Sequence, residues 1–233
     1  MKVCAYGLAG VTPGRHHVKD PRLDQTHVLV EAKKRTYAQV DVATAEEALT
    51  SDAIAVTPSS RLELVLHDLE FVETRLERAT EPVERAMLGK LKTALEAEQL
   101  VSTVELTAEE RQLVAVQPLL TAKPVVAANA EEAANFGEFL VRVLAESGYI
   151  CFLTVGGPEN RAWLIRQGAT APEAAGAIHT DIQKGFIRAE VIGFADFLAA
   201  GGETQAKRAN KLRLETKQYI VQDYDLLNFR FNK

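Results

Sequence analysis

A glycine-rich loop near the start of the chain is the first place where residue types and spacing could support chemistry. The segment GLAGVTPGR follows a run of small and apolar residues with the pattern of a β-strand. Backbone N–H groups in such a loop can surround a phosphate. The working motif is GxxxxGK[ST], in which the lysine neutralises phosphate charge and the hydroxyl holds magnesium. The position of the loop therefore suggests a nucleotide site.

Most of the side chains that this motif requires are replaced. The first glycine is present as Gly7, but Thr12, Pro13 and Gly14 stand in the glycine, lysine and hydroxyl positions. Proline also removes one backbone N–H, and the nearest cation, Arg15, is displaced by two positions from the lysine. We expect a simple glycine-rich turn, with at most a vestigial nucleotide contact at Gly7 and no catalysis.

The C-terminal part carries cationic side chains that could contact an anionic partner. Residues 148–233 hold 11 Lys and Arg against 9 Asp and Glu, whereas residues 1–147 hold 16 against 23. We expect these cations to bind RNA or another partner with an affinity that falls as salt rises. The candidates are Arg161, Arg166, His179, Lys184, Arg188, Lys211, Arg213 and Arg230. Because strand side chains alternate between faces, the candidates cannot all share one surface.

Other reactive or aromatic side chains favour structural roles. His179 and Asp181 could form part of a metal or general-base site, but no third ligand or nucleophile has a suitable spacing. We expect His179 to meet free carbonyls at a helix C-terminus, and no metal is expected. Cys4 and Cys151 lie far apart, which favours buried thiols. Four aromatic residues could stack on bases but are expected mainly in the core: Trp163, Phe186, Phe229 and Phe231.

The elements expected before residue 148 form a small α/β lobe with a helical arm. Apolar residues from Ser60 onward recur every three or four positions, Ser60 and Glu63 have capping-box spacing, and Pro82 marks a second helix start. We expect an antiparallel hairpin of two helices, over about 60–79 and 82–99, whose apolar faces bury each other. Strands are expected near the N-terminus and over 26–30, 35–42, 52–56 and 123–130, and further helices over 107–117 and 131–147.

The last third has the order of an α+β domain. Short apolar strands alternate with helices, and one helix begins with the capping pair Thr170 and Glu173. A single mixed sheet crossed by a helix, the β-grasp arrangement, satisfies this order. The strands are expected over 149–155, 162–166, 186–194 and 226–231, and the helices over 170–178 and 195–200.

Several segments resemble one known family. RAWLIRQGATAPEAAGAIHTDIQKGFIRAEVIGFADFLAAGG and KLRLETKQYIVQDYDLLNFRFN closely resemble the TGS-like C-terminal domain of YchF-type, Obg-related nucleotide-binding proteins. RLELVLHDLEFVETRLER resembles the start of that family's helical arm, and QPLLTAKPVVAANAEE resembles the strand before its base-recognition motif. DPRLD and QVDVAT also have counterparts. The resemblance suggests a shortened relative, with a truncated nucleotide-domain remnant and arm over 1–147 and a TGS-like β-grasp domain over 148–233.

The resemblance implies a P-loop domain that prefers ATP over GTP, and association with the ribosome. Asn129 and Glu132 match the NxxE motif by which the family reads the base, so they are further candidates for vestigial nucleotide binding. An asparagine that caps a helix explains the same residues without a ligand.

Other positions depart from the family pattern. Asp41 matches the aspartate of DxxG, but Thr44 replaces its glycine, and the stretch 13–24 is too short for the family's switch segments. Tyr224 and Thr216 replace turn glycines in the TGS-like part. Because both lose easy access to positive φ, we expect these turns to differ in type from the family's.

Three functions remain open on the sequence. The first is a non-catalytic binding protein that contacts the ribosome, RNA or a protein through the TGS-like domain and needs no cofactor. The second is a protein with weak ATP or GTP binding and residual hydrolysis, and the third is a small-molecule sensor. No apolar run is long enough for a membrane span and no secretory leader is recognisable, so a cytoplasmic protein is expected.

Overall fold

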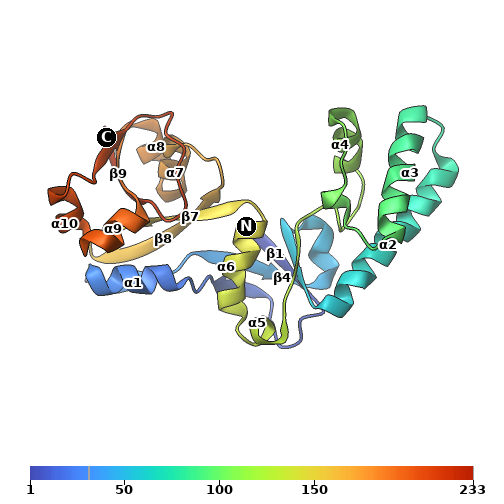
Figure 1. The fold of residues 1–233 in the computed structure, drawn as a ribbon, viewed down its shortest axis with the longest axis horizontal. Helices are drawn as coiled ribbons and strands as arrows, with labels where there is room; N and C mark the ends of the chain where they lie inside the picture. Colours follow the sequence, from blue (N-terminus) through green and yellow to red (C-terminus); the bar gives the residue numbers. More distant parts are fainter. Residues whose placement is uncertain (31, 233) are drawn as a thin grey trace. The chain divides into compact units, whose positions relative to one another are not determined.

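The computed structural model describes residues 1–30 and 32–232, and these divide into two compact units. The first unit comprises Met1–His16 and Val40–Ser147, and the second comprises His17–Gln39 and the chain from Gly148 onward. Figure 1 shows the elements of each unit. This division differs from the single N-terminal domain that the sequence predicts over 1–147. The segment 17–39 belongs to the second unit because its helix and strand both contact the second sheet.

The first unit is built on a sheet in the order β2-β4-β1-β5-β6. The pairings of β1 with β4, β1 with β5 and β5 with β6 are all parallel. β5 is buried along its whole length, as expected for a central parallel strand. The strands are β1 (Lys2–Tyr6), β2 (Gly14–His17), β4 (Gln39–Ala43), β5 (Ala53–Val56) and β6 (Val125–Ala127).

The predicted helical hairpin is confirmed as α2 (Pro58–Arg78) and α3 (Pro82–Glu96), which pack on each other. Val65 and Val72 of α2 bury their side chains with Met87 and Leu91 of α3. The apolar stripe is narrower than the spacing suggested, since Leu62 and Val83 are 41% and 42% exposed. The cap also differs: Thr57 accepts the Ser60 N–H, so the predicted Ser60 cap is wrong. Serine and threonine are close alternatives at a cap.

Shorter helices complete the first unit. The capping box of Thr107 and Glu110 is confirmed at α4 (Ala108–Ala115). The single helix predicted over 131–147 is instead two helices, because Asn135 leaves helical geometry with φ −110° and ψ 52°. The other helical elements are the 3₁₀ turns η1 (Ala45–Thr50) and η2 (Val101–Thr103), α5 (Ala130–Ala134) and α6 (Phe136–Glu146).

The second unit has a mixed sheet in the order β10-β9-β11-β7-β8-β3. β11 runs parallel to β7 and β3 runs parallel to β8, whereas the β7–β8, β9–β11 and β9–β10 pairs are antiparallel. The strands are β3 (Lys34–Thr36), β7 (Tyr149–Thr154), β8 (Glu159–Arg166), β9 (Phe186–Ile192), β10 (Arg213–Glu215) and β11 (Leu226–Phe231).

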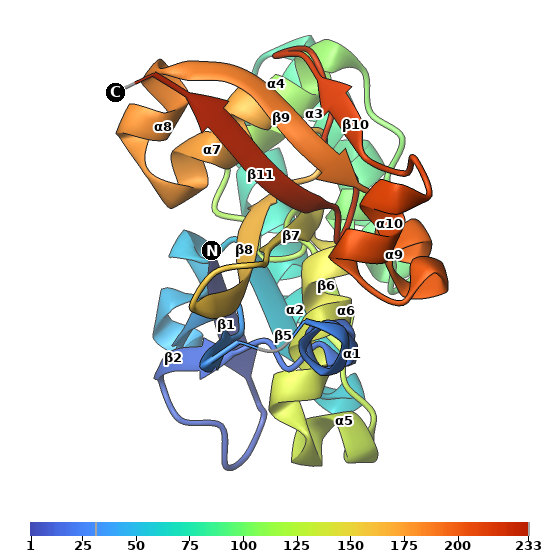
Figure 2. The same cartoon turned by 90° about the vertical axis from the view of Figure 1, so that its left-hand side faces the viewer.

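A helix covers one face of this sheet. The buried alanines of α7 (Ala171–Ile178) pack on Phe152, Val191 and Phe229. Figure 2 shows β9 and β11 with their opposite face toward the viewer, and none of the described helices crosses the two strands in that view. The remaining helices are α1 (Pro21–Leu29), α8 (Thr180–Lys184), α9 (Phe194–Ala200) and α10 (Glu203–Arg208).

The strand predicted over 26–30 is wrong, because this segment belongs to α1. Asp20 caps the helix by accepting the Arg22 N–H at 2.9 Å, and Pro21 supplies its first residue. Leu23 and Thr26 are fully buried, and α1 contacts β8. The cap and this packing outweigh the strand preference of the β-branched residues. The run predicted over 35–42 is likewise split between β3 and β4.

Candidate functional site

The loop after β1 is shaped by close packing on the start of α2. Gly7 has φ +69°, and a Cβ atom built on it would lie 2.1 Å from the Ser60 Oγ atom. Only glycine fits both this conformation and this approach. The loop then continues into the strand β2, not into a helix. Arg15 on β2 lies 3.7 Å from Asp41, and both side chains are largely exposed.

This loop therefore differs from a phosphate cradle in geometry as well as in residue types. A phosphate-binding loop directs several N–H groups and a helix N-terminus at its ligand. In the described part of the chain, the segment after Gly7 supplies a strand in place of that helix. The α2 N-terminus beside it is capped by its own residue, Thr57.

Asn129 and Glu132 form a reciprocal capping box at the start of α5. The Glu132 N–H donates to Asn129 Oδ1, and the Asn129 N–H donates to Glu132 Oε2, both at 2.9 Å. Arg142 of α6 donates to both Glu132 oxygens at 2.8 Å and also to the Ala127 carbonyl. These Arg142 hydrogen bonds lower the pKa of Glu132. The carboxylate is thus ionised and fully engaged within the protein.

The parallel order of β1, β5 and β6 brings the candidate nucleotide residues to one edge of the sheet. Gly7, Thr57 and Asn129 follow the ends of these three strands. That edge is where α/β proteins commonly bind ligands. Beside it lies an open groove whose described lining includes Glu131, Glu138 and Phe139 together with Glu132 and Arg142. Its several carboxylates do not suit a triphosphate.

Two predicted cations of the second unit are stacked on aromatic rings. The Arg161 guanidinium carbon lies 3.9 Å from the centre of the Trp163 ring, and that of Arg166 lies 4.0 Å from the Tyr149 ring. Trp163 itself packs in the core. Because Arg161 and Arg166 are five positions apart on β8, they project from opposite faces.

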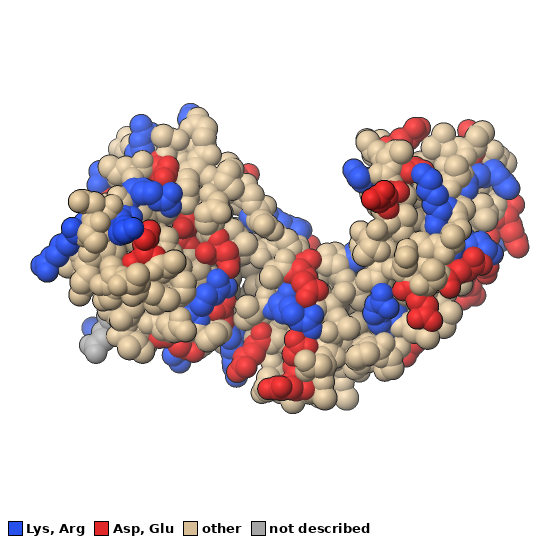
Figure 3. Space-filling view, in the orientation of Figure 1, with Lys and Arg blue, Asp and Glu red and all other residues tan. Residues whose placement is uncertain are grey.

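Other candidates on this unit pair with acids. Lys211 Nζ lies 3.0 Å from Asp196, and an Arg213 nitrogen lies 3.3 Å from Glu215. Arg213 also donates to the Tyr219 hydroxyl at 3.1 Å. Figure 3 shows Lys and Arg side chains exposed on this unit, interspersed with acidic ones.

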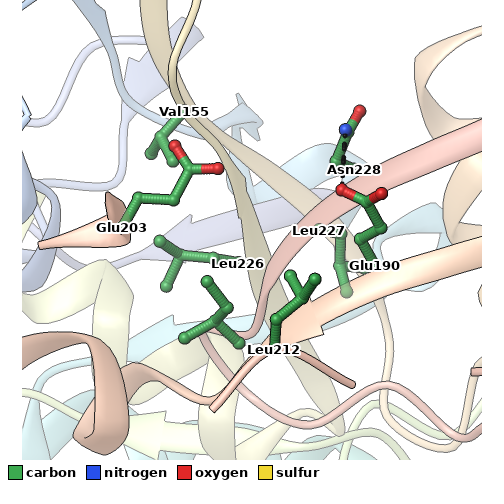
Figure 4. A pocket seen from close by; sticks show the side chains of 8 residues that line it. Val155, Glu190, Glu203, Leu212, Leu226, Leu227 and Asn228 are labelled. Carbon is green, nitrogen blue, oxygen red and sulfur yellow. Dashed lines mark hydrogen bonds between the residues drawn. The ribbon is translucent and has the colours of Figure 1, made fainter. Parts of the chain in front are cut away.

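A pair of arginines lies on the uncovered face of the sheet. Arg188 on β9 is directly opposite Arg230 on β11. Arg230 Nε donates to Glu190 at 2.8 Å, which lowers the pKa of Glu190. Asn228 donates to the other Glu190 oxygen, as Figure 4 shows at one end of a small pocket. The described lining of that pocket holds Glu190 and Glu203 but no Lys or Arg, so the pocket itself does not suit an anion.

An open groove lies between α8 and the end of β11. Its described lining includes His179, Asp181, Ile182, Lys184, Phe231 and Asn232. Phe231 is 38% exposed, whereas Phe229, two positions earlier, is only 9% exposed. His179 ends α7, but its Nδ1 accepts the Asp181 N–H at 3.1 Å. The predicted bond from His179 to free helix carbonyls is therefore wrong, because the ring caps the start of α8.

Sequence reasoning missed a partly buried cluster that joins α1 to the turn before β11. Arg22 donates to Asp20 and, at 2.6 Å, to Asp223, and its guanidinium carbon lies 3.7 Å from the centre of the Tyr224 ring. Tyr224 is 1% exposed and has φ +63°. Replacement of the family's glycine by Tyr224 therefore does not remove positive φ from this turn, because packing on Arg22 and Phe194 holds the tyrosine in that conformation.

The arrangement defines a class of protein: a parallel α/β unit carries a helical-hairpin arm, and a second unit is built on a mixed sheet. The ribosome-binding ATPase YchF of Bacillus subtilis is 33% identical over an aligned length of 246 residues, and the alignment covers 78% of this chain and 67% of that protein. The chain belongs to the YchF family, as its sequence predicted. Residues 149–232 match the family model YchF-GTPase_C, described as a protein of unknown function (DUF933).

Other comparisons agree with this placement. The ribosome-binding ATPase YchF of Haemophilus influenzae is 59% identical over 81 residues, covering 35% of this chain but only 22% of that protein. The structure of the Schizosaccharomyces pombe YchF GTPase matches with a TM-score of 0.72 over 95% of this chain and 89% of that one, at 20% identity. That match supports the fold.

Among the described residues, none of the helices is both long and apolar enough to cross a membrane. Nor do those residues contain a cluster of three or more His, Cys, Asp or Glu side chains that could hold a metal ion.

Proposed function

We propose that this chain is a non-catalytic member of the YchF family that associates with ribosomal RNA through its second unit. The observation that carries the proposal is the loop after β1, which leads into a strand and has Pro13 and Gly14 where a phosphate loop has lysine and a hydroxyl. We interpret this loop as a degenerate P-loop. Two of the relatives described above are named as ribosome-binding ATPases, which supports the ribosome as partner.

The physical reason to exclude catalysis is electrostatic. Phosphoryl transfer places negative charge on the γ-phosphate oxygens, and catalysis depends on a positioned ammonium group and magnesium to stabilise it. Arg15, the cation nearest the loop in sequence, lies on β2 beside Asp41. Without an ammonium group and magnesium, the loop has no positive charge to replace the water that a triphosphate loses on binding.

The second unit is the part that we propose contacts the partner, as a TGS-like β-grasp domain. A mixed sheet with α7 across one face and an uncovered opposite face at β9 and β11 is consistent with that identification. It carries the cations expected of an RNA-binding surface, including Lys184 and Arg188, which have no ion-pair partner among the described residues.

A second candidate function is weak binding of ATP or GTP. The observation that favours it is the position of Asn129 and Glu132 at the same sheet edge as Gly7. In this structure, however, Glu132 is already bound by Arg142 and by the Asn129 N–H. A base would have to displace these contacts to use the carboxylate.

Co-sedimentation with ribosomes tests the first proposal. We expect the chain to pellet with ribosomes equally with and without ATP, and to be released as salt is raised, because counterion release drives such binding. A Lys211→Ser, Arg213→Ser double variant should pellet less, whereas Arg15→Ser, an exposed cation of the first unit, should not differ from the wild type. Failure to pellet at low salt would refute ribosome association, and pelleting that requires ATP would favour the second candidate.

A further inference from the structure

The uncovered face of the second sheet carries charged side chains on two neighbouring strands, β9 and β11. Residues directly opposite each other on such strands point to the same side of the sheet. The alternate residues of both strands belong to the core beneath α7. The register therefore puts two facing pairs on the uncovered side, which Figure 2 turns toward the viewer: Arg188 with Arg230, and Glu190 with Asn228.

The cations of this face are more exposed than its acids. The Arg230 side chain is 55% exposed, whereas that of Glu190, to which it donates, is 13% exposed. Arg230 lowers the pKa of Glu190, and Lys207 of α10 adds to this shift, which places Lys207 near the same carboxylate. Lys207 is in turn more exposed than its own partner, Glu203. A molecule that approaches this face therefore meets guanidinium and ammonium groups first, with the carboxylates behind them.

Arg188 is exposed and has no carboxylate partner among the described residues. Its described hydrogen bond goes to the carbonyl of its own neighbour, Ile187. Like charges directly opposite each other on a sheet are destabilising, so the stability of the fold does not explain why Arg188 faces Arg230. Proteins keep such locally unfavourable choices mainly at functional sites.

We propose that this face binds the phosphate backbone of double-stranded RNA, with Arg188 and Arg230 as the main phosphate contacts and Lys207 beside them. The inference rests on the proposed function and names the surface of the second unit that makes the contact. A guanidinium group matches a phosphate with two parallel hydrogen bonds. Because the Cβ atoms of directly opposite residues lie about 5 Å apart, both arginines can reach the same phosphate group.

The aromatic residues of β9 and β11 lie on the other side of the sheet, and this favours a duplex over a single strand. Phe186 and Phe229 pack with the core beneath α7, and Phe231 lines the groove beside α8. Single-stranded nucleic acid is held largely by stacking of its bases on such rings. A duplex keeps its bases stacked on each other and is bound through its phosphates and 2′-hydroxyl groups. An exposed arginine pair without a neighbouring ring suits the second kind of ligand.

Fluorescence anisotropy of a labelled RNA duplex tests the proposal. The probe is a blunt duplex of about 16 base pairs, the length that a double-stranded-RNA-binding domain spans. We expect Arg188→Ser to weaken binding about tenfold and to reduce the slope of log affinity against log salt by about 1. Arg188→Lys should keep the slope and lose less affinity, because an ammonium retains the charge but not the paired hydrogen bonds. Lys19→Ser, which removes an exposed charge before α1 of the same unit, is the matched control and should leave affinity and slope unchanged.

Urea unfolding of the same variants separates binding from folding. Because Arg188 faces a like charge, Arg188→Ser should unfold with a free energy no lower than that of the wild type, although it binds the duplex more weakly. A lower free energy of unfolding for Arg188→Ser would overturn the argument, since the arginine pair would then serve the stability of the sheet.

The binding outcomes separate this proposal from the wider one. Absence of duplex binding, equal binding by Arg188→Ser and wild type, or tighter binding of oligouridylate or of polyglutamate would overturn the assignment of this face. Ribosome co-sedimentation of the same samples is read independently. If the wild type pellets with ribosomes but the duplex result is negative, the assignment of the face is wrong and ribosome association stands; the reverse pattern supports the face and refutes the ribosome as partner.

Discussion

Replacement of Arg22 by alanine should selectively destabilise the second unit. The guanidinium donates to Asp20 through two nitrogens and to Asp223 at 2.6 Å, and it covers the face of Tyr224. The side chain of Asp20 is only 5% exposed, so alanine would leave a buried carboxylate without its guanidinium partner. Asp20 and Asp223 also raise the pKa of Arg22, although burial opposes this.

The magnitude follows from the burial of the pair. Removing one partner of a fully buried ion pair costs about 3–5 kcal/mol. Because the Arg22 side chain is 32% exposed, solvent reduces the cost, and we expect a loss of about 2–4 kcal/mol in the free energy of unfolding. Arg22→Lys should fall between alanine and wild type, since an ammonium cannot make the same bidentate contacts.

Urea unfolding followed by tryptophan fluorescence measures this loss. Trp163 is the single tryptophan of the chain, and it packs against Phe152 in the second unit. Arg15→Ala is the control, because its ion pair with Asp41 is exposed and should contribute at most about 0.5 kcal/mol. If Arg22→Ala lowers the free energy of unfolding no more than Arg15→Ala does, the cluster does not hold α1 to this unit.

Three further changes test other parts of the structure. Tyr224→Gly should lower the free energy of unfolding by about 2 kcal/mol in the same urea assay, because the lost buried ring outweighs the roughly 1 kcal/mol gained at positive φ; a stabilised variant would contradict the packing argument. Gly7→Ala should cost about 2 kcal/mol, since its Cβ would meet Ser60, and an unchanged Tm would refute that contact. Arg142 lowers the pKa of Glu132, so this pair stabilises the fold above the unfolded pKa of glutamate, about 4.3. The stabilisation is lost as pH falls through the lower pKa of Glu132 in the folded state. The free energy of unfolding, measured across this acid range, should fall in the wild type and fall less in Arg142→Ala.

Local signals in the sequence predicted much of the fold. The spacing of apolar residues located α2 and α3, and the capping pair of Thr107 and Glu110 located α4. Strands β7, β8, β9 and β11 of the second unit were predicted because β-branched and aromatic residues are concentrated there, whereas the short strand β10 was missed. The reading of Asn129 as a helix cap is also confirmed.

The features that the sequence did not predict depend on distant contacts. Thr26 and Val28 favour a strand locally, but the cap at Asp20 and packing on β8 make the segment helical. Arg22 meets Asp223 across 201 positions, a pairing that no local pattern encodes. Tyr224 keeps positive φ because its ring is held by that same arginine.

The surfaces formed by the candidate cations also depend on distant contacts and could not be predicted from the sequence. Their residue types were evident, but their surfaces were not, because pairing register decides which strand side chains share a face. The register places Arg188 opposite Arg230, whereas Arg161 and Arg166 project from opposite faces of β8. Phe231 was expected mainly in the core, but it is the last residue of β11 and is 38% exposed.

Calorimetric titration of the purified chain with ATP, with and without magnesium, tests the central claim most directly. The loop from Gly7 to Gly14 lacks a lysine and a positioned hydroxyl and leads into a strand, so we expect no saturable heat at micromolar ATP in either condition. Saturable binding with a micromolar Kd that requires magnesium would contradict the account, because such binding needs a phosphate site that this loop does not provide.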